Sequence, residues 1–128
     1  MNPENEIGAR IVNAAFRVHS FLGPGLLESC YEKCLVFEII KSGMKVQAQV
    51  ALPLIYREMV METIYRIDLL VDETVIVEVK AVEKLENVHL AQLLTYLRLS
   101  GCKLGYLINF NVSSLKLGIK RVVLGLPE

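Results

Sequence analysis

The sequence predicts a single α/β domain in which helices flank a central mixed β-sheet. The chain of 128 residues has the length of one ordinary domain, and no repeat or linker rich in Pro, Gly or Ser divides it. Its apolar residues recur first with helical spacing, then with the alternation of strands, and then with helical spacing again. The resulting order is α-α-β-β-β-α-β with a short strand at the end. Because a hairpin lies within that order, we expect the sheet to be mixed.

Three segments have the apolar spacing of helices. The first covers residues 4–22 and ends where a Gly-Pro-Gly sequence breaks it, since proline cannot continue a helix. The second is expected over residues 26–41, where a Ser-Gly pair provides a C-terminal stop signal. The third is expected over residues 87–100 and is followed by another glycine.

Five segments have the character of strands. Residues 45–56 form the first, and Pro53 places its far end at an edge or a bulge, because proline cannot donate to a ladder. The next two are joined by a short turn and form a hairpin. These and the remaining strands are expected over residues 62–71, 74–80, 104–110 and 119–124.

The charges of the chain cancel, with 14 Lys and Arg against 14 Asp and Glu. This balance argues against a basic protein that coats nucleic acid non-specifically, although a local basic patch could still engage it. The mean hydropathy of +0.43 is high for a small monomer, and spare apolar surface often ends in a subunit interface. We therefore expect a homodimer.

No segment carries the pattern of a membrane span or of a secretion signal. No stretch approaches about 18 consecutive apolar residues, and the first residues, MNPENEIGAR, lack the basic and apolar regions of a signal peptide. Cys30, Cys34 and Cys102 make an odd count without the spacing of a disulfide framework. We expect a protein of the reducing cytoplasm with no membrane partner.

The segment YRIDLLVDETVIVEVK places two acids and a lysine on the expected hairpin. Alternate residues of a strand point to the same side, so Arg66 and Asp68 share one face of their strand. Glu78 and Lys80 likewise share one face of the next strand.

The length of the hairpin loop decides whether the two acids meet. If residues 72–74 form the loop, Val71 pairs with Val75, and Asp68 lies opposite Glu78 with Cβ atoms about 4.5–5.5 Å apart. A two-residue turn would shift the register by one residue and separate the acids.

Two carboxylates at that distance repel each other unless a cation or a proton lies between them. Magnesium prefers oxygen ligands and is often held by one or two carboxylates, which leaves water molecules for a substrate phosphate. In this interpretation Lys80 orients the attacking water. The residues also allow a second interpretation, an exposed strand face on which Glu78 and Lys80 are solvated.

Polar residues of two helices could complete such a site. On the third helix His89, Gln92 and Tyr96 lie together, away from a leucine face. That face consists of Leu90, Leu93, Leu94 and Leu97. On the second helix Glu28 borders an expected apolar arc, where it could point along the rim of the sheet or simply be a favourable charge at a helix N-terminus. The arc contains Leu26, Leu27, Cys30, Tyr31, Cys34 and Phe37.

The segment GLLESCY, from Gly25 to Tyr31, matches the G-x-x-E-x-x-Y element of the GxxExxY protein family. The flanking LGPGLLESCYEK, the strand end VEVKAVEKL and the run LAQLLTYLRLSGCKLGYLINF also resemble that family, over residues 5–124. The family in turn is similar to the PD-(D/E)XK nuclease superfamily. The resemblance implies one restriction-endonuclease-like domain over residues 1–128, with a central mixed β-sheet flanked by helices.

The resemblance gives roles to six polar residues. In chain order they are Glu28, Asp68, Glu78, Lys80, Gln92 and Tyr96. The first would be the acid on the helix before the sheet, and the next three would be the acids and the lysine of the PD-(D/E)XK motif. The last two would be the Q-x-x-x-Y helix motif of the RecB-like exonuclease branch. Ile67 stands where the motif has proline, which is a mild departure.

The function implied by the resemblance is that of a nuclease, dependent on Mg²⁺ or Mn²⁺, that hydrolyses phosphodiester bonds, and we expect its substrate to be DNA. Two alternatives stay open. One is a non-catalytic module that keeps the fold but binds nucleic acid or assembles with proteins. The other is a dimer that resembles a Holliday-junction resolvase.

The implied site residues fall into three groups. The catalytic group is Glu28, Asp68, Glu78, Lys80 and Gln92. The metal would be held by Asp68, Glu78 and the backbone carbonyl of Val79, with Glu28 binding directly or through water. The residues expected to contact the substrate are Tyr96, His89 and Arg66.

Overall fold

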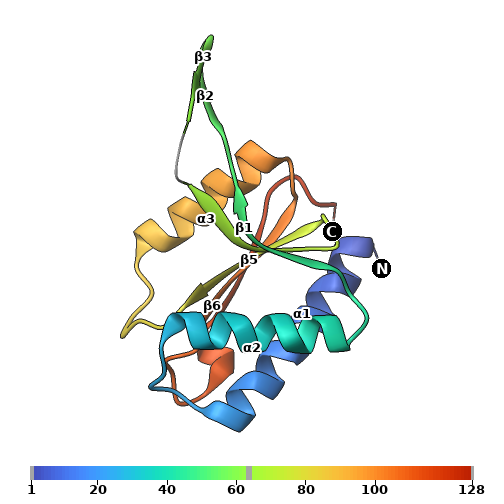
Figure 1. The fold of residues 1–128 in the computed structure, drawn as a ribbon, viewed down its shortest axis with the longest axis vertical. Coiled ribbons are helices and arrows are strands. Elements are labelled where there is room, and N and C mark those ends of the chain that lie inside the picture. The colour runs from blue at the N-terminus through green and yellow to red at the C-terminus, as the bar shows by residue number, and fades with distance from the viewer. Residues whose placement is uncertain (1, 63–64, 128) are drawn as a thin grey trace.

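The fold is a five-stranded mixed sheet with helices on both faces (Figure 1). The computed structural model describes residues 2–62 and 65–127. In chain order the elements are α1 (Pro3–Leu22), α2 (Glu28–Lys41), β1 (Val46–Ala51), β2 (Leu54–Tyr56), β3 (Met59–Met61), β4 (Arg66–Val71), β5 (Val75–Lys80), α3 (Asn87–Ser100), β6 (Leu104–Asn109), the 3-10 helix η1 (Leu115–Leu117) and β7 (Ile119–Val123). α1 and α2 cover one face of the sheet and α3 covers the other, so the predicted α/β class is confirmed.

The order of strands in the sheet is β1-β4-β5-β6-β7. The pairs β1–β4, β4–β5 and β6–β7 are antiparallel, whereas β5 and β6 are parallel. A parallel pair needs a crossover connection, and α3 supplies it because it lies between β5 and β6 in the chain. The predicted mixed sheet and the predicted order of elements are therefore observed, with one addition.

The addition is a small two-stranded sheet, β2–β3, that projects from the domain as an arm (Figure 1). The single strand predicted over residues 45–56 is wrong, because the ladder stops at Ala51, and Pro53, which has no N–H to donate, separates β1 from β2. The strand predicted over residues 62–71 begins only at Arg66. Residues 63–64 of that prediction fall outside the described part of the chain.

α2 differs from its prediction in both start and orientation. It begins at Glu28, later than the expected residue 26, because the two leucines before it are exposed and Leu27 has extended backbone. The residues that it buries, four apart, are Tyr31, Leu35 and Ile39. Phe37 of the predicted arc is 61% exposed. The regular i, i+4 stripe is fully buried, whereas Cys34 of the predicted arc is only partly buried against the same core.

α3 begins and ends close to its prediction, and Gly101 follows it with a φ of 80°, which favours glycine. Its buried residues are Leu93, Tyr96 and Leu97, whereas Leu94 of the predicted leucine face is exposed. The helix can approach β6 closely because a Cβ at Gly105 would lie 2.9 Å from the Leu93 side chain. None of the helices within the described ranges is both long and apolar enough to cross a membrane.

Tyr31 ties the start of α2 to the Gly-Pro-Gly loop before it. Its ring is fully buried and stacks on Phe110, with ring centroids 4.8 Å apart. Its hydroxyl donates to the Gly23 carbonyl at 2.6 Å and accepts the N–H of Leu26 at 3.1 Å. The final tyrosine of the G-x-x-E-x-x-Y element therefore fixes the path of this loop.

Tyr31→Phe should lower the free energy of unfolding by about 1–3 kcal/mol, because it leaves the Gly23 carbonyl and the Leu26 amide without their partner. Urea denaturation followed by circular dichroism measures the change. Tyr56→Phe, at an exposed tyrosine of the arm, is the matched control and should change stability by less than about 0.5 kcal/mol. Equal stability of Tyr31→Phe and the wild type would contradict this role of the hydroxyl.

Candidate active site

The hairpin β4–β5 has the register predicted for a loop over residues 72–74. Val71 pairs with Val75, and the ladder continues to Leu69 and Val77. One residue further along each strand, Asp68 and Glu78 come together, and their carboxylates bond to the backbone. The N–H of Asp68 donates to Oε2 of Glu78 at 2.8 Å. Each acid thus meets the strand that carries the other.

The second of these bonds completes the exchange. The N–H of Val79, next to Glu78, donates to Oδ2 of Asp68 at 2.9 Å. At this level of the sheet, side-chain carboxylates accept the hydrogen bonds that backbone carbonyls accept in a regular antiparallel ladder. Both carboxylates are therefore held in fixed orientations by the fold itself.

The neighbouring strand β1 is also irregular at this level. Ala48 and Val50 pair with β4, and Gln49 between them has a φ of 56°. The Gln49 side-chain amide donates to both carboxylate oxygens of Glu32 on α2, at 3.1 and 3.2 Å, and lies 3.5 Å from Oδ1 of Asp68. Gln49 therefore links α2 to the acid pair.

Glu32 and Gln49 are site residues that the sequence interpretation missed. Glu32 could have been found, because it lies four residues after Glu28 and so on the same side of the helix. Gln49 carries no such signal, since its side chain reaches the site only through an unusual backbone conformation. Glu28 itself is exposed at the first turn of α2, and its charge acts on Glu32.

Burial makes the acids hard to ionise. Glu78 is only 3% exposed, and desolvation, with the nearby charge of Asp68 as the next cause, raises its pKa to about 8. Burial also raises the pKa of Asp68 and that of Glu32. The Lys80 ammonium lowers the pKa of both Asp68 and Glu78, but it offsets the desolvation only in part.

Lys80 is held by the strand end on which it lies. Its carbonyl accepts the N–H of Phe110 at 2.9 Å. Two residues beyond it, Val82 makes a pair of hydrogen bonds with the side chain of Asn109, which is 2% exposed: its N–H donates to Oδ1 at 3.0 Å, and its carbonyl accepts from Nδ2 at 2.9 Å. The chain leaving β5 therefore has a fixed direction, and the predicted lysine lies close enough to act on both acids.

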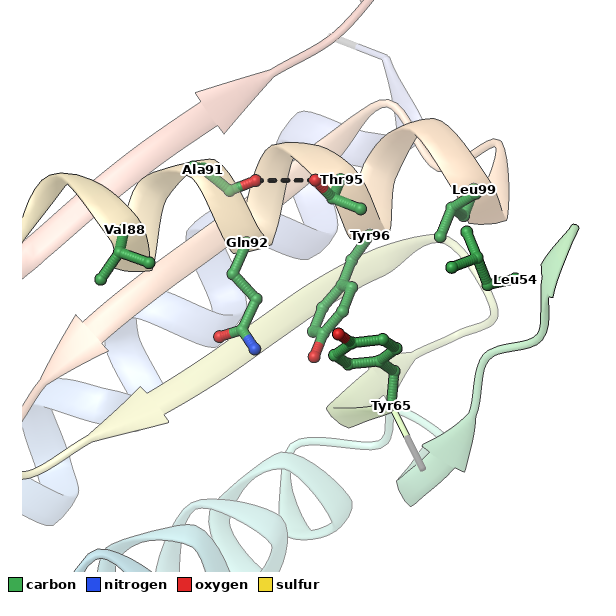
Figure 2. Close-up of a pocket in the computed structure, with 8 residues that line it drawn as sticks. All are labelled: Leu54, Tyr65, Val88, Ala91, Gln92, Thr95, Tyr96 and Leu99. Atoms are coloured by element: carbon green, nitrogen blue, oxygen red, sulfur yellow. Dashed lines mark hydrogen bonds between the residues drawn. The ribbon is translucent and has the colours of Figure 1, made fainter. Parts of the chain in front are cut away.

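Gln92 and Tyr96 approach the acids from α3, on the other face of the sheet from α2. Figure 2 shows both side chains pointing away from the helix, with the Tyr96 ring next to Tyr65. Burial raises the pKa of the Tyr96 hydroxyl, and the charges of Glu78 and Asp68 raise it further, while a hydrogen bond with Gln92 lowers it. The structure therefore brings this predicted pair within electrostatic reach of the acids.

His89 and Arg66 lie at the border of this region. Nδ1 of His89 accepts the N–H of Glu86 at 2.9 Å, as one half of a capping box at the start of α3. The ring therefore has only Nε2 left for another partner. Arg66 is exposed at the start of β4, with Nη1 3.5 Å from the Gln49 carbonyl.

The donor atoms of the acid pair fit a hard divalent cation. The pKa values of the buried Glu78 and the half-buried Asp68 are raised because Lys80 compensates their charge only in part, and two carboxylates are a number of oxygen ligands that suits Mg²⁺. Over residues 2–62 and 65–127, no group of three or more His, Cys, Asp or Glu side chains is arranged to hold a metal ion. Further ligands would have to be backbone carbonyls, water or substrate.

Fold and site together define a class of protein. Two acids meet on adjacent antiparallel strands, a lysine follows the second acid by two residues, and helices cover both faces of a mixed sheet. This combination agrees with the core of a restriction-endonuclease-like nuclease domain.

A family model described as the PD-(D/E)XK nuclease superfamily matches residues 5–122, so the chain belongs to this superfamily. Membership indicates a nuclease, a hydrolase of phosphodiester bonds that acts on nucleic acid, and such nucleases generally use divalent metal ions. Searches of curated proteins and of solved structures each gave no significant match.

In the metal-free protein, stability should fall as the pH rises from about 5 to about 8. The pKa of Glu78, about 8 in the folded protein against 4.5 for an ordinary glutamate, means that only the folded state keeps this proton in that range. Stability decreases with pH wherever the native state binds more protons than the unfolded state. Urea denaturation in the presence of a chelator, at several pH values, measures the slope.

Glu78→Gln should flatten that slope, because the amide accepts the same N–H but does not titrate. The matched control is Glu83→Gln, at an exposed glutamate, which should keep the wild-type slope. A wild-type protein whose stability does not change between pH 5 and 8 would show that Glu78 is not the buried acid described above.

Proposed function

We propose that the protein is a Mg²⁺- or Mn²⁺-dependent nuclease that cleaves DNA. The observation that supports this most directly is the buried pair Asp68–Glu78 beside Lys80, in a chain of the PD-(D/E)XK superfamily. Two desolvated acids side by side oppose folding at neutral pH. Strongly perturbed acids in such a cluster are typical of functional sites, and a bound cation would relieve their repulsion.

Asp68, Glu78 and the backbone carbonyl of Val79 would hold the cation. One oxygen of each carboxylate accepts a backbone N–H, which fixes the orientation of the group, and the other oxygen of Asp68 faces the Gln49 amide at 3.5 Å. Glu28 and Glu32 on α2 would bind through water. When bound, the cation polarises the scissile phosphate and lowers the pKa of a water molecule.

The remaining residues orient the reacting groups. Lys80 positions the attacking water and balances the negative charge that develops on the phosphate, since its ammonium can donate hydrogen bonds but cannot ligate a cation. Gln92 orients Lys80 or the substrate backbone from α3. Tyr96, Arg66 and His89, the last through Nε2, would contact the substrate.

We also propose that the protein is a cytoplasmic homodimer. The apolar side chains that the arm leaves exposed are Ile55, Tyr56, Met59, Val60 and Met61, and an apolar surface of this kind favours association. The three cysteines are free thiols, and a reducing compartment keeps thiols in this state. Light scattering at micromolar concentration should give the mass of a dimer, and a monomer mass over a wide concentration range would contradict the proposed assembly.

Lys80→Ala should lower the cleavage rate by about 10²-fold or more, in the range lost with a positioned proton-transfer group, while metal affinity stays close to that of the wild type. Glu78→Ala should lose both cleavage and metal binding, because it removes a ligand. Gln92→Ala should lower the rate less than Lys80→Ala does, since only orientation is lost. Linear, branched and single-stranded DNA with Mg²⁺ or Mn²⁺ provide the rate measurement, and calorimetry provides the affinity.

Lys84→Ala is the matched control for Lys80→Ala, because Lys84 is exposed and follows the site by four residues. It should cleave like the wild type. If Lys80→Ala and Glu78→Ala also cleave like the wild type, the activity belongs to another site. If the wild type cleaves no DNA or RNA with either metal, the chain is a non-catalytic module, and preference for branched DNA would identify a junction resolvase.

Glu32→Gln should weaken metal binding more than Glu28→Gln. Glu32 is bonded to Gln49 beside Asp68, and its charge raises the pKa of Glu78, whereas Glu28 is exposed one turn earlier. Removing the closer charge takes away more of the attraction for a cation. Calorimetric titration with Mn²⁺ compares the two variants. A larger loss of metal affinity in Glu28→Gln would show that Glu28, and not Glu32, is the acid of α2 that acts on the metal.

A further inference from the structure

We propose that a cavity beside the acid pair holds one unpaired nucleobase of the substrate, so that the protein acts on single-stranded nucleic acid or on unpaired segments of a duplex. This inference rests on the proposed nuclease function and adds the class of substrate. The cavity lies between α3, the base of the arm and Tyr65 (Figure 2). Its lining residues are Leu54, Tyr65, Val88, Ala91, Gln92, Thr95, Tyr96 and Leu99.

The size of the cavity suits a single base. Its volume is about 320 Å³, at the lower end of the range of small-molecule pockets. This space accommodates one flat ring system, whereas a duplex segment is far too large to enter. A base could occupy it only after leaving its stack, as in enzymes that turn a nucleotide out of the helix.

The walls of the cavity have the chemistry of a base-binding site. Tyr65, which is 48% exposed, provides an aromatic face, and Leu54, Val88 and Leu99 provide apolar ones, whereas Tyr96 is only 4% exposed and adds little surface. Bases stack on such rings with about 1–3 kcal/mol per base. The Gln92 amide offers both donors and acceptors for the edge of a base.

Among the residues that the structure describes, none that lines the cavity is charged, which argues against a phosphate as its occupant. A phosphate group is bound by Arg, Lys, backbone N–H groups or metal ions, whereas a neutral heterocycle suits aromatic and amide groups. The balanced charge of the whole chain agrees with this, because binding to a duplex through its phosphates generally needs a basic surface.

The cavity adjoins the acid pair. Tyr96 belongs to its lining, and the charges of Glu78 and Asp68 act on the Tyr96 hydroxyl. A nucleotide whose phosphate lies at the acids could therefore place its base in the cavity. The arm forms part of the opposite wall through Leu54 of β2, which gives this projecting hairpin a role in shaping the site.

The test uses a DNA oligonucleotide that contains 2-aminopurine, a base whose fluorescence falls when it stacks on an aromatic ring. A chelator in the buffer removes metal ions, so that no cleavage occurs. The wild-type protein should quench the probe in a single strand, and it should bind the single strand at least about 10-fold tighter than the same sequence in a duplex. Tyr65→Ala should weaken binding by about 5- to 100-fold, the range given by the loss of one stacking partner. Tyr65→Phe, which keeps the ring, should bind like the wild type.

The matched control is Tyr56→Ala. Tyr56 is 59% exposed, close to the 48% of Tyr65, but it does not line the cavity, so its removal should leave binding unchanged. Ala91→Trp is an independent test, because Ala91 is an exposed helix position where a large side chain would fill the cavity without disturbing the core. It should weaken binding as Tyr65→Ala does.

Two results would overturn the inference. In the first, the wild-type protein binds the duplex as tightly as the single strand. In the second, Tyr65→Ala and Ala91→Trp both bind the single strand as tightly as the wild type does. If metal-dependent cleavage of duplex DNA persists in those variants, the nuclease proposal stands without the base pocket. If the probe is quenched as expected but no substrate is cleaved with Mg²⁺ or Mn²⁺, the base pocket stands and the nuclease proposal fails.

Discussion

Two reciprocal hydrogen bonds between β4 and β5 hold the site together. The N–H of Asp68 donates to the Glu78 carboxylate, and the N–H of Val79 donates to the Asp68 carboxylate. A buried backbone N–H without an acceptor is costly, so each carboxyl group completes the hydrogen bonding of the sheet in addition to its place in the acid pair. This double role explains why acids can stay in a place where burial raises their pKa values.

The same constraint prepares the site for chemistry. Because the backbone fixes both carboxylates, and the bonds of Asn109 to Val82 direct the chain that leaves Lys80, the charged groups need little rearrangement when a substrate arrives. Such preorganised charges are a main source of catalytic power in enzymes. In the proposed nuclease the sheet would therefore supply the reacting groups, and the helices on its two faces bring further residues, Glu32 from one side and Tyr96 from the other.

The sequence by itself determined the order of the elements and the mixed sheet, and it predicted that the two acids meet for one of two possible lengths of the hairpin loop. Helical and strand periodicity are local properties, so they are legible without knowledge of the fold. The register also follows from a local feature: a loop over residues 72–74 pairs Val71 with Val75, and strand alternation then brings Asp68 to Glu78. Lys80 is placed by the same alternation, two residues after the second acid.

Only the tertiary structure decided what lies around this hairpin. Glu32 is an ordinary helical glutamate in the sequence, and it joins the site because the backbone of Gln49 on another strand turns to meet it. The buried stripe of α2 and the separate arm β2–β3 depend in the same way on which surfaces pack together. The cavity at Tyr65 is lined by residues from three separate parts of the chain. Contacts between distant segments create these features, and such contacts leave no periodic pattern in the sequence.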